Sequence, residues 1–525
     1  MSTFELSLWA RSRGIGKLSV AVVRDGVTVS RATIRGLRGN WTRHSVRLTV
    51  PIRGAKPGAL FYLRLSFSGP GTVWLDEAFL FPTDHVEGFD PDVIRLWREA
   101  RLPLLRFPGG NFVSGYHWND GIGPVEQRPT RRNPAWGGAE YNHVGTDEMM
   151  ALCRAIGCEP LICVNAGNGT APEAAEWVEY CNGSVDTRYG ARRALNGHPE
   201  PYNVRFWEIG NELYGKWQIG CCGATEYAKR YGEFTRAMRS VDPGIRFIAN
   251  GHEPDWNAEV VRRNGAMVRS LSTHPLIGGA VSADTEPEDV FRALMGYTHV
   301  YPRILRRLAL PMRRAGLTPR IAVTELQVFV HVPTLPNNRT LTEALWTASM
   351  LNAAIRSGGL VELVTHSALV NHGGCVLKQR EFVWPEPVYF THKLYGTQTG
   401  VLPLHVKYSG PCHRAPHVRG VPRGRRVPEL DAVALASGRG DEVTLIVVNR
   451  RPGGGLRVPI ALHGFARAPV VRVRELTGRS FMAANTFEKP DKVRLRSRTV
   501  RAEGSRLVHT FPPHSLTELV FRAAR

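Results

Sequence analysis

The chain has 525 residues, of which 43% are hydrophobic and 22% are charged, as in folded soluble proteins. This length exceeds one ordinary single-core domain and predicts two or three domains. The net charge of +22 raises the question of nucleic-acid binding, but no basic stretch alternates with stacking aromatic residues. We therefore expect a scattered basic surface and no nucleic-acid partner.

Targeting and cross-linking signals are also missing from the sequence. No apolar run approaches the roughly 18 residues of a membrane span, so we expect no membrane partner. The opening MSTFELSLWARSRG is not a signal-peptide pattern. As written, the chain is expected in the cytoplasm, and secretion stays open if its N-terminus is incomplete. The eight cysteines include no CxxC pair, which favours buried free thiols over disulfides or a metal site.

Residues 1–82 are rich in segments with alternating apolar residues, separated by turn residues. They are FELSLWARS (4–12), LSVAVVRDG (18–26), HSVRLTVPI (44–52), LFYLRLSFSG (60–69) and TVWLDEAFLF (72–81). This pattern predicts an antiparallel β-sandwich. Such a module either binds carbohydrate or serves as a structural addition.

From about residue 83 apolar strand candidates alternate with helical segments. Seven strands are expected, in LLRFPGGN (104–111), PLICVNAG (160–167), VRFWEIGNE (204–212), RFIANG (246–251), VRSLSTH (268–274), RIAVTELQVF (320–329) and LVTHSALVN (363–371). The alternation predicts an α/β fold, a (β/α)8 TIM barrel over residues 83–395. A doubly wound sheet is the alternative, but no glycine-rich phosphate loop follows a strand. Because only seven strands are counted, either residues 72–81 are shared or the first barrel strand is missing.

After about residue 396 the helical pattern stops. Short strand candidates separated by Gly and Pro follow, among them DAVALASG, EVTLIVVNR, VVRVRELTG and LTELVFRA. We expect a second β-sandwich over residues 396–525.

Polar residues stand at the carboxyl ends of the predicted barrel strands, where active sites of this fold lie. They are Asn111, Asn165, Glu212, His274, Glu325 and Asn371. A single strand-end Glu is most simply an ion-pair partner, but two on one barrel face suit acid/base and nucleophilic work on a glycosidic bond. Glu208, four residues before Glu212, is instead expected to be a buried partner of Arg106.

The motifs RFPGGNFVSGYHWNDGIGP (106–124), WEIGNELYGKWQIG (207–220) and AVTELQVF (322–329) resemble glycoside hydrolase family 51, the α-L-arabinofuranosidases. NTFEKPDKV and FPPHSLTELVF resemble the C-terminal sandwich of that family. The similarity runs from about residue 90 to the end. Residues 1–82 resemble a carbohydrate-binding-type insert found in one branch of the family.

The resemblance implies a role for each matching position. Glu212 corresponds to the general acid/base and Glu325 to the nucleophile. Asn211 corresponds to the residue that binds the sugar 2-hydroxyl, Asn111 to a second arabinose contact, and His274 to a histidine near the nucleophile. We expect a retaining exo-acting α-L-arabinofuranosidase that uses no metal or cofactor, acts on arabinan, arabinoxylan or their oligosaccharides, and forms homo-oligomers as the family does. The nearby Glu325 charge is expected to raise the pKa of Glu212.

The sequence departs from the family at three places. Pro275 and Leu276 stand where an aromatic residue follows the histidine, and Leu326 replaces a frequent Trp, although Phe329 offers an aromatic wall. No upstream strand with a substrate-binding Glu is present. Trp118 is a candidate for sugar stacking, with loop packing nearly as common an explanation. Two other functions stay open: an endo-β-1,4-glucanase or xylanase of the same family, and a sugar-binding protein with little turnover.

Overall fold

The computed structural model describes residues 2–51, 59–379, 382–502 and 506–524. They form two compact units, one of Met1–Ile94 with Pro124–Gln127 and one of Arg95–Gly123 with Arg128–Arg525. The domain boundaries predicted near residues 82 and 395 stay predictions.

The first unit is the predicted antiparallel sandwich. One sheet has the order β4-β1-β6, from Thr42–Val50, Ser2–Arg13 and Thr72–Pro82. The other has the order β3-β2-β5, from Val27–Arg35, Lys17–Arg24 and Phe61–Ser66. Alternate side chains of β1, such as Leu6 and Leu8, enter the core between the sheets. Residues 72–81 pair with β1 and thus belong to this sandwich.

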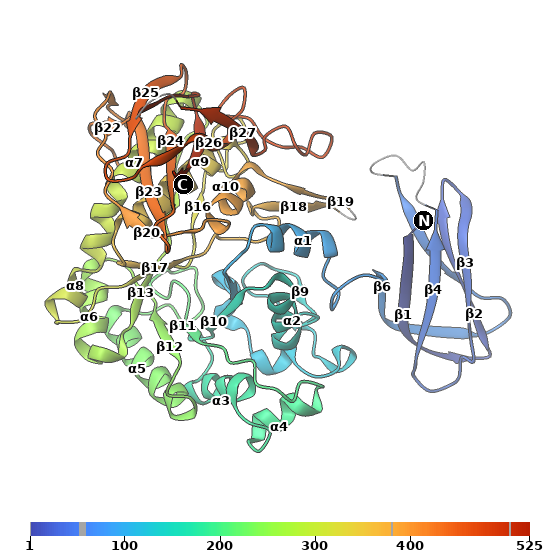
Figure 1. The fold of residues 1–525 in the computed structure, drawn as a ribbon. Coiled ribbons are helices and arrows are strands. Elements are labelled where there is room, and N and C mark those ends of the chain that lie inside the picture. The colour runs from blue at the N-terminus through green and yellow to red at the C-terminus, as the bar shows by residue number, and fades with distance from the viewer. Residues whose placement is uncertain (1, 52–58, 380–381, 503–505, 525) are drawn as a thin grey trace. The chain divides into compact units, whose positions relative to one another are not determined.

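The second unit is built around a parallel sheet of seven strands in the order β17-β15-β13-β12-β11-β10-β7. These strands are Val361–Val364, Ile321–Val323, Ser270–Thr273, Arg246–Ala249, Phe206–Ile209, Glu159–Val164 and Leu104–Phe107, and each overlaps a predicted segment. The sheet curls with helices outside it, as in a (β/α)8 barrel, and β7 and β17 are its outer strands (Figure 1). The predicted barrel class is confirmed.

Helices follow most of these strands and cover them. They are α1 (Pro91–Glu99), α2 (Thr146–Ile156), α3 (Ala171–Asn182), α4 (Arg188–Leu195), α5 (Ala224–Val241), α6 (Pro254–Asn264), α7 (Pro287–Leu308), α8 (Leu310–Arg314), α9 (Leu341–Arg356) and α10 (Pro387–Gly396). Inside the sheet, Leu161, Ile248 and Ala322 form a buried apolar cluster. The polar residues predicted at the strand ends follow the strands at the carboxyl edge of the sheet.

The C-terminal part of this unit is the second predicted sandwich. Its main sheet has the order β20-β23-β24-β29-β26-β27, and the pair β25–β28 packs over a shared apolar core (Figure 1). The strands are Gly400–Leu404, Leu430–Ser437, Glu442–Asn449, Ser515–Ala523, Arg467–Leu476, Arg496–Arg501, Leu456–Ala461 and Arg506–Phe511. All eight cysteines are free, but only Cys153, Cys163, Cys181 and Cys375 are buried, so the expectation of buried thiols holds for half of them. Among the described helices, none has the length and apolar character needed to span a membrane.

Candidate active site

The loop after β11 presents Glu212 from a strained backbone. Gly210 has φ +79° and allows the chain to turn sharply out of the strand, and Glu212 itself has φ +47°. The left-handed region is uncommon for residues other than Gly, Asn and Asp, and such strain gathers at functional sites. The Leu213 N–H donates to Asn250 Oδ1 at 2.6 Å, which helps to hold this turn.

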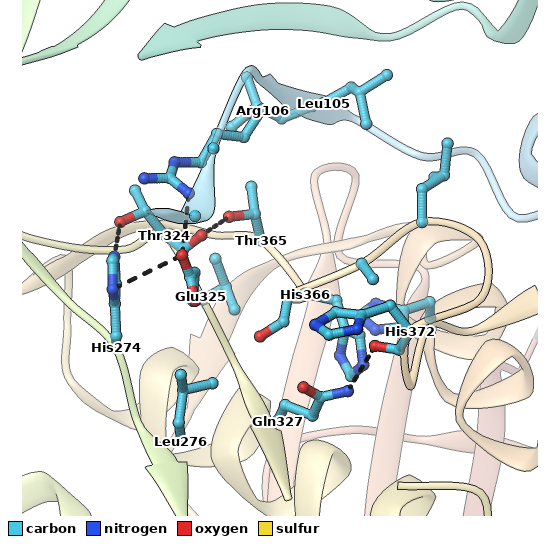
Figure 2. Close-up of a pocket in the computed structure, with 18 of the residues that line it drawn as sticks. Leu105, Arg106, His274, Leu276, Thr324, Glu325, Gln327, Thr365, His366 and His372 are labelled. Carbon is cyan, nitrogen blue, oxygen red and sulfur yellow. Dashed lines mark hydrogen bonds and ion pairs between the residues drawn. The ribbon is translucent and has the colours of Figure 1, made fainter. Parts of the chain in front are cut away.

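His274, which follows β13, lies between the two predicted carboxylates. Its Nδ1 is 2.9 Å from Glu212 Oε1. The same nitrogen is 3.8 Å from Glu325 Oε1, on the carboxylate that follows β15 (Figure 2). Oxygens of the two carboxylates approach within 4.8 Å of each other. The short parallel pair β14 (Leu276–Ile277) and β16 (Gln327–Val328) continues both strands and holds His274 and Glu325 in register.

The hydrogen-bond chain behind His274 determines where protons lie. Thr324 Oγ1 donates to Glu208 Oε1 at 2.8 Å, so its oxygen accepts from His274 Nε2–H, also at 2.8 Å. The Nδ1–Oε1 contact between His274 and Glu212 therefore contains a single proton, shared by the two groups.

The pKa shifts place that proton on the imidazole. Burial alone raises the pKa of Glu212, but hydrogen bonds from His274, Trp217 and Tyr214 outweigh it and lower the pKa below its ordinary value. Burial lowers the pKa of His274, but the charges of Glu325 and Glu212 outweigh it and raise the pKa. The expectation of a raised Glu212 pKa is thus wrong for the free protein, because a neighbouring base takes the proton.

Arg106 on β7 donates hydrogen bonds to two carboxylates and one amide of the site. Its Nε donates to Glu208, Nη1 to Glu325 Oε1 at 3.2 Å and Nη2 to Asn211 Oδ1 at 2.7 Å. Burial lowers the pKa of Arg106, but the negative charges of Glu208 and Glu325 have a larger opposite effect. The net pKa is raised, so the guanidinium stays charged. The predicted ion pair between Glu208 and Arg106 is confirmed.

A cavity of about 820 Å³ opens over the carboxylates. Aromatic side chains from three segments line it: Trp136, Tyr214 with Trp217, and Phe329. Trp217 Nε1 donates to Glu212 Oε2 at 2.9 Å. The cavity also continues between the outer strands β7 and β17 to Tyr395 on α10.

The predicted sugar-binding residues have different surroundings. Asn111 lines the cavity and accepts a hydrogen bond from Gln218 Nε2 at 2.8 Å, and Phe329 also lines the cavity. Asn211 is buried beside Glu212, and its Nδ2 has no hydrogen-bond partner among the described residues. Asn165 instead accepts a hydrogen bond from the Gly167 backbone N–H, and Asn371 accepts one from the Lys378 backbone N–H.

The prediction of sugar stacking at Trp118 is corrected. Its indole is 1% exposed, donates to the Glu173 carbonyl oxygen and stacks on Trp177 at 6.0 Å. No ring face of Trp118 is open to a ligand, so it is a packing residue.

Four side chains at the site were not predicted: Arg106 as a contact of Glu325, and the cavity residues Trp136, Tyr214 and Trp217. Tyr214 and Trp217 follow Glu212 within one quoted motif, and their closeness in sequence was the available signal. Trp136 comes from a loop with no periodic pattern.

The curled parallel sheet and the two carboxylates at its carboxyl end define a glycoside hydrolase of the (β/α)-barrel class. Residues 98–270 match the family "Alpha-L-arabinofuranosidase 1 domain", and residues 322–515 match "Alpha-L-arabinofuranosidase C-terminal domain". The chain belongs to the α-L-arabinofuranosidases of glycoside hydrolase family 51.

Similarities to individual proteins support this family assignment. The probable α-L-arabinofuranosidase C of Aspergillus fumigatus is 30% identical over 84% of this chain and 90% of its own length. The intracellular exo-α-(1→5)-L-arabinofuranosidase of Halalkalibacterium halodurans is 28% identical over 73% and 80%, respectively. The solved structure of the thermostable family 51 α-L-arabinofuranosidase from Thermotoga petrophila is 35% identical, with a TM-score of 0.74, covering 83% of this chain and 91% of that one.

Proposed function

We propose that this chain is a retaining, exo-acting α-L-arabinofuranosidase that removes terminal arabinofuranosyl groups from arabinan, arabinoxylan or their oligosaccharides. The observation that carries the proposal is the approach of Glu212 and Glu325 oxygens within 4.8 Å across His274. Retaining enzymes hold their carboxyl groups about 5–5.5 Å apart, whereas inverting enzymes need about 6.5–9.5 Å for a water between them.

In this mechanism Glu325 attacks the anomeric carbon and the bond to the leaving oxygen breaks. Arg106 Nη1 lies 3.2 Å from Glu325 Oε1 and places a positive charge beside the nucleophile. The proton shared by His274 and Glu212 passes through Glu212 Oε to the leaving oxygen. The His274–Glu212 pair has then lost its proton, so Glu212 can take one from the attacking water as the water oxygen bonds to the anomeric carbon and the bond to Glu325 breaks.

Proton NMR of the reaction tests retention directly. An aryl α-L-arabinofuranoside should release α-L-arabinofuranose as the first product, before mutarotation. Initial release of the β anomer would contradict the mechanism. Digests of linear arabinan should yield arabinose alone from the start, because the exo action of the Halalkalibacterium relative supports removal of terminal groups. Early oligosaccharides would instead indicate the endo-acting alternative.

Asn211 is expected to bind the sugar 2-hydroxyl through its unpartnered Nδ2. Asn211→Ala should lower kcat/KM by about 10²- to 10³-fold, as for the loss of one positioned donor. A 2-deoxy-arabinofuranoside checks the contact: it should react poorly with the wild type and suffer little further loss in the variant. Additive losses from the two changes would contradict the assignment.

His274 is expected to set the alkaline limit of activity. With a raised pKa, the His274–Glu212 pair keeps its proton above the pH at which an ordinary imidazole loses it. In His274→Asn only the Glu212 carboxyl group can hold the proton. The alkaline limb of the pH profile of kcat/KM should therefore move to lower pH. The matched control is His372→Asn, because His372 lines the cavity without a hydrogen bond from its ring to either carboxylate among the described contacts. An unchanged alkaline limb in His274→Asn would rule out the shared proton.

A further inference from the structure

A second group of metal-ligand residues lies away from the carboxylate pair. His366 lies two residues after the end of β17, Cys375 directly precedes β18 (Val376–Gln379), and His392 lies on α10. One possible ligand atom from each residue lies within 4.8 Å of the other two. Three separate elements thus bring two imidazoles and a thiol together, at a spacing along the chain that no short sequence motif would reveal.

The ring nitrogens of this group lack well-aligned partners although they are buried. Cys375 is 0% exposed, and the side chain of His366 is 5% exposed. His392 Nε2 has no hydrogen-bond partner among the described residues, and the ring nitrogens of His366 have at most a poorly aligned contact with the Gly373 backbone. Buried polar atoms without partners are rare and call for an explanation, and a bound cation supplies one.

The chemistry of the surrounding groups suits a cation. A neutral imidazole offers one ring-nitrogen lone pair to a metal ion. Glu343, buried on α9, has Oε1 at 3.8 Å from His366 Nε2, and a cation beside it would favour its ionised form.

We propose that His366, Cys375 and His392 bind a zinc ion, with Glu343 as the fourth ligand. Neutral imidazoles with one thiolate and one carboxylate form a donor set that zinc prefers, and the two negative charges balance its charge in a buried place. Binding forms one Zn–S, two Zn–N and one Zn–O bond and releases the thiol proton, together with the Glu343 proton where it is present.

Zinc bonds of about 2.0–2.3 Å put tetrahedral ligand atoms about 3.3–3.8 Å apart. The ligand atoms of His366, Cys375 and His392 lie within 4.8 Å of one another, so side-chain rotation has to bring these three closer and turn Glu343 towards them. The ion would fasten the ends of β17 and β18 to α10. His366 and His392 also line the cavity, so the ion would strengthen one of its walls without touching Glu212 or Glu325 (Figure 2).

Metal titration of the full chain tests the proposal. After dialysis against a chelator, Co²⁺ should bind with one equivalent showing a thiolate-to-cobalt charge-transfer band and tetrahedral d–d bands. Zinc should displace it. Cys375→Ala should abolish the charge-transfer band and weaken zinc binding by at least about 100-fold, more than the loss of an outer-shell partner. Cys181→Ala is the matched control, because Cys181 is an equally buried free thiol on α3.

Two results would overturn the proposal. One is a charge-transfer band that persists in Cys375→Ala, and the other is cobalt binding without that band, which would place the ion at Glu212, His274 and Glu325. Zinc K-edge absorption of the wild-type chain keeps the test independent of variant folding. It should show one sulfur and lighter N/O neighbours, and a shell without sulfur would refute the site.

Discussion

Glu325→Ala should reduce kcat/KM towards an aryl α-L-arabinofuranoside by about 10⁴-fold or more, because removal of a nucleophile abolishes the covalent step. Azide should restore part of the activity, since a small anion fits the space left by the carboxylate. The restored product should be the β-configured glycosyl azide, formed by a single inverting displacement. Steady-state kinetics and NMR of the product measure both effects.

The matched control for this variant is Glu159→Gln. Glu159 begins β10 at the opposite end of the barrel and pairs with Arg205 at the surface, so its loss should leave turnover unchanged. Near wild-type activity in Glu325→Ala would contradict the nucleophile assignment. Recovery with azide to an α-configured product would instead assign Glu325 the acid/base role.

Arg106→Met is expected to be the most destabilising single change in the barrel. It leaves Glu208, which is 0% exposed, buried without its cation. Removing one partner of a buried ion pair costs about 3–5 kcal/mol, because the remaining charge stays desolvated. Urea unfolding followed by tryptophan fluorescence measures this loss. Activity should also fall, since Arg106 contacts both Glu325 and Asn211.

Arg205→Met provides the comparison. Arg205 also pairs with a glutamate, but the side chains of Arg205 and Glu159 are 53% and 46% exposed. Such surface pairs contribute about 0–1 kcal/mol. Equal losses of stability in the two variants would show that burial does not govern the Arg106 pair. The double variant Arg106→Met/Glu208→Leu should recover much of the stability, because no unpaired charge remains.

The strands and the two carboxylates could be predicted because their signals are local. Short apolar runs ending in polar residues identify parallel strands, and strand ends of one barrel meet at one face. Glu212 and Glu325 therefore came together as predicted although 112 residues separate them in the sequence. The buried pair of Glu208 and Arg106 followed from the same logic, since a charge inside a strand needs a partner.

Other features depend on contacts between distant segments. The lowered pKa of Glu212 arises from His274 and Trp217, whose distances from Glu212 no periodic pattern reports. Trp118 was assigned to the wrong environment because an aromatic residue in a loop looks the same whether it faces a ligand or Trp177. The approach of His366, Cys375 and His392 likewise needs the folded positions of three elements.

The left-handed backbone of Glu212 implies a conflict between thermal stability and catalytic activity. At φ +47° the position suits glycine or asparagine better than glutamate, so the residue needed for chemistry is the one that the local backbone disfavours. A population selected only for resistance to heat should drift towards Gly or Asn at position 212 and lose hydrolysis as it does so. If glutamate persists at position 212, selection for activity has outweighed selection for stability.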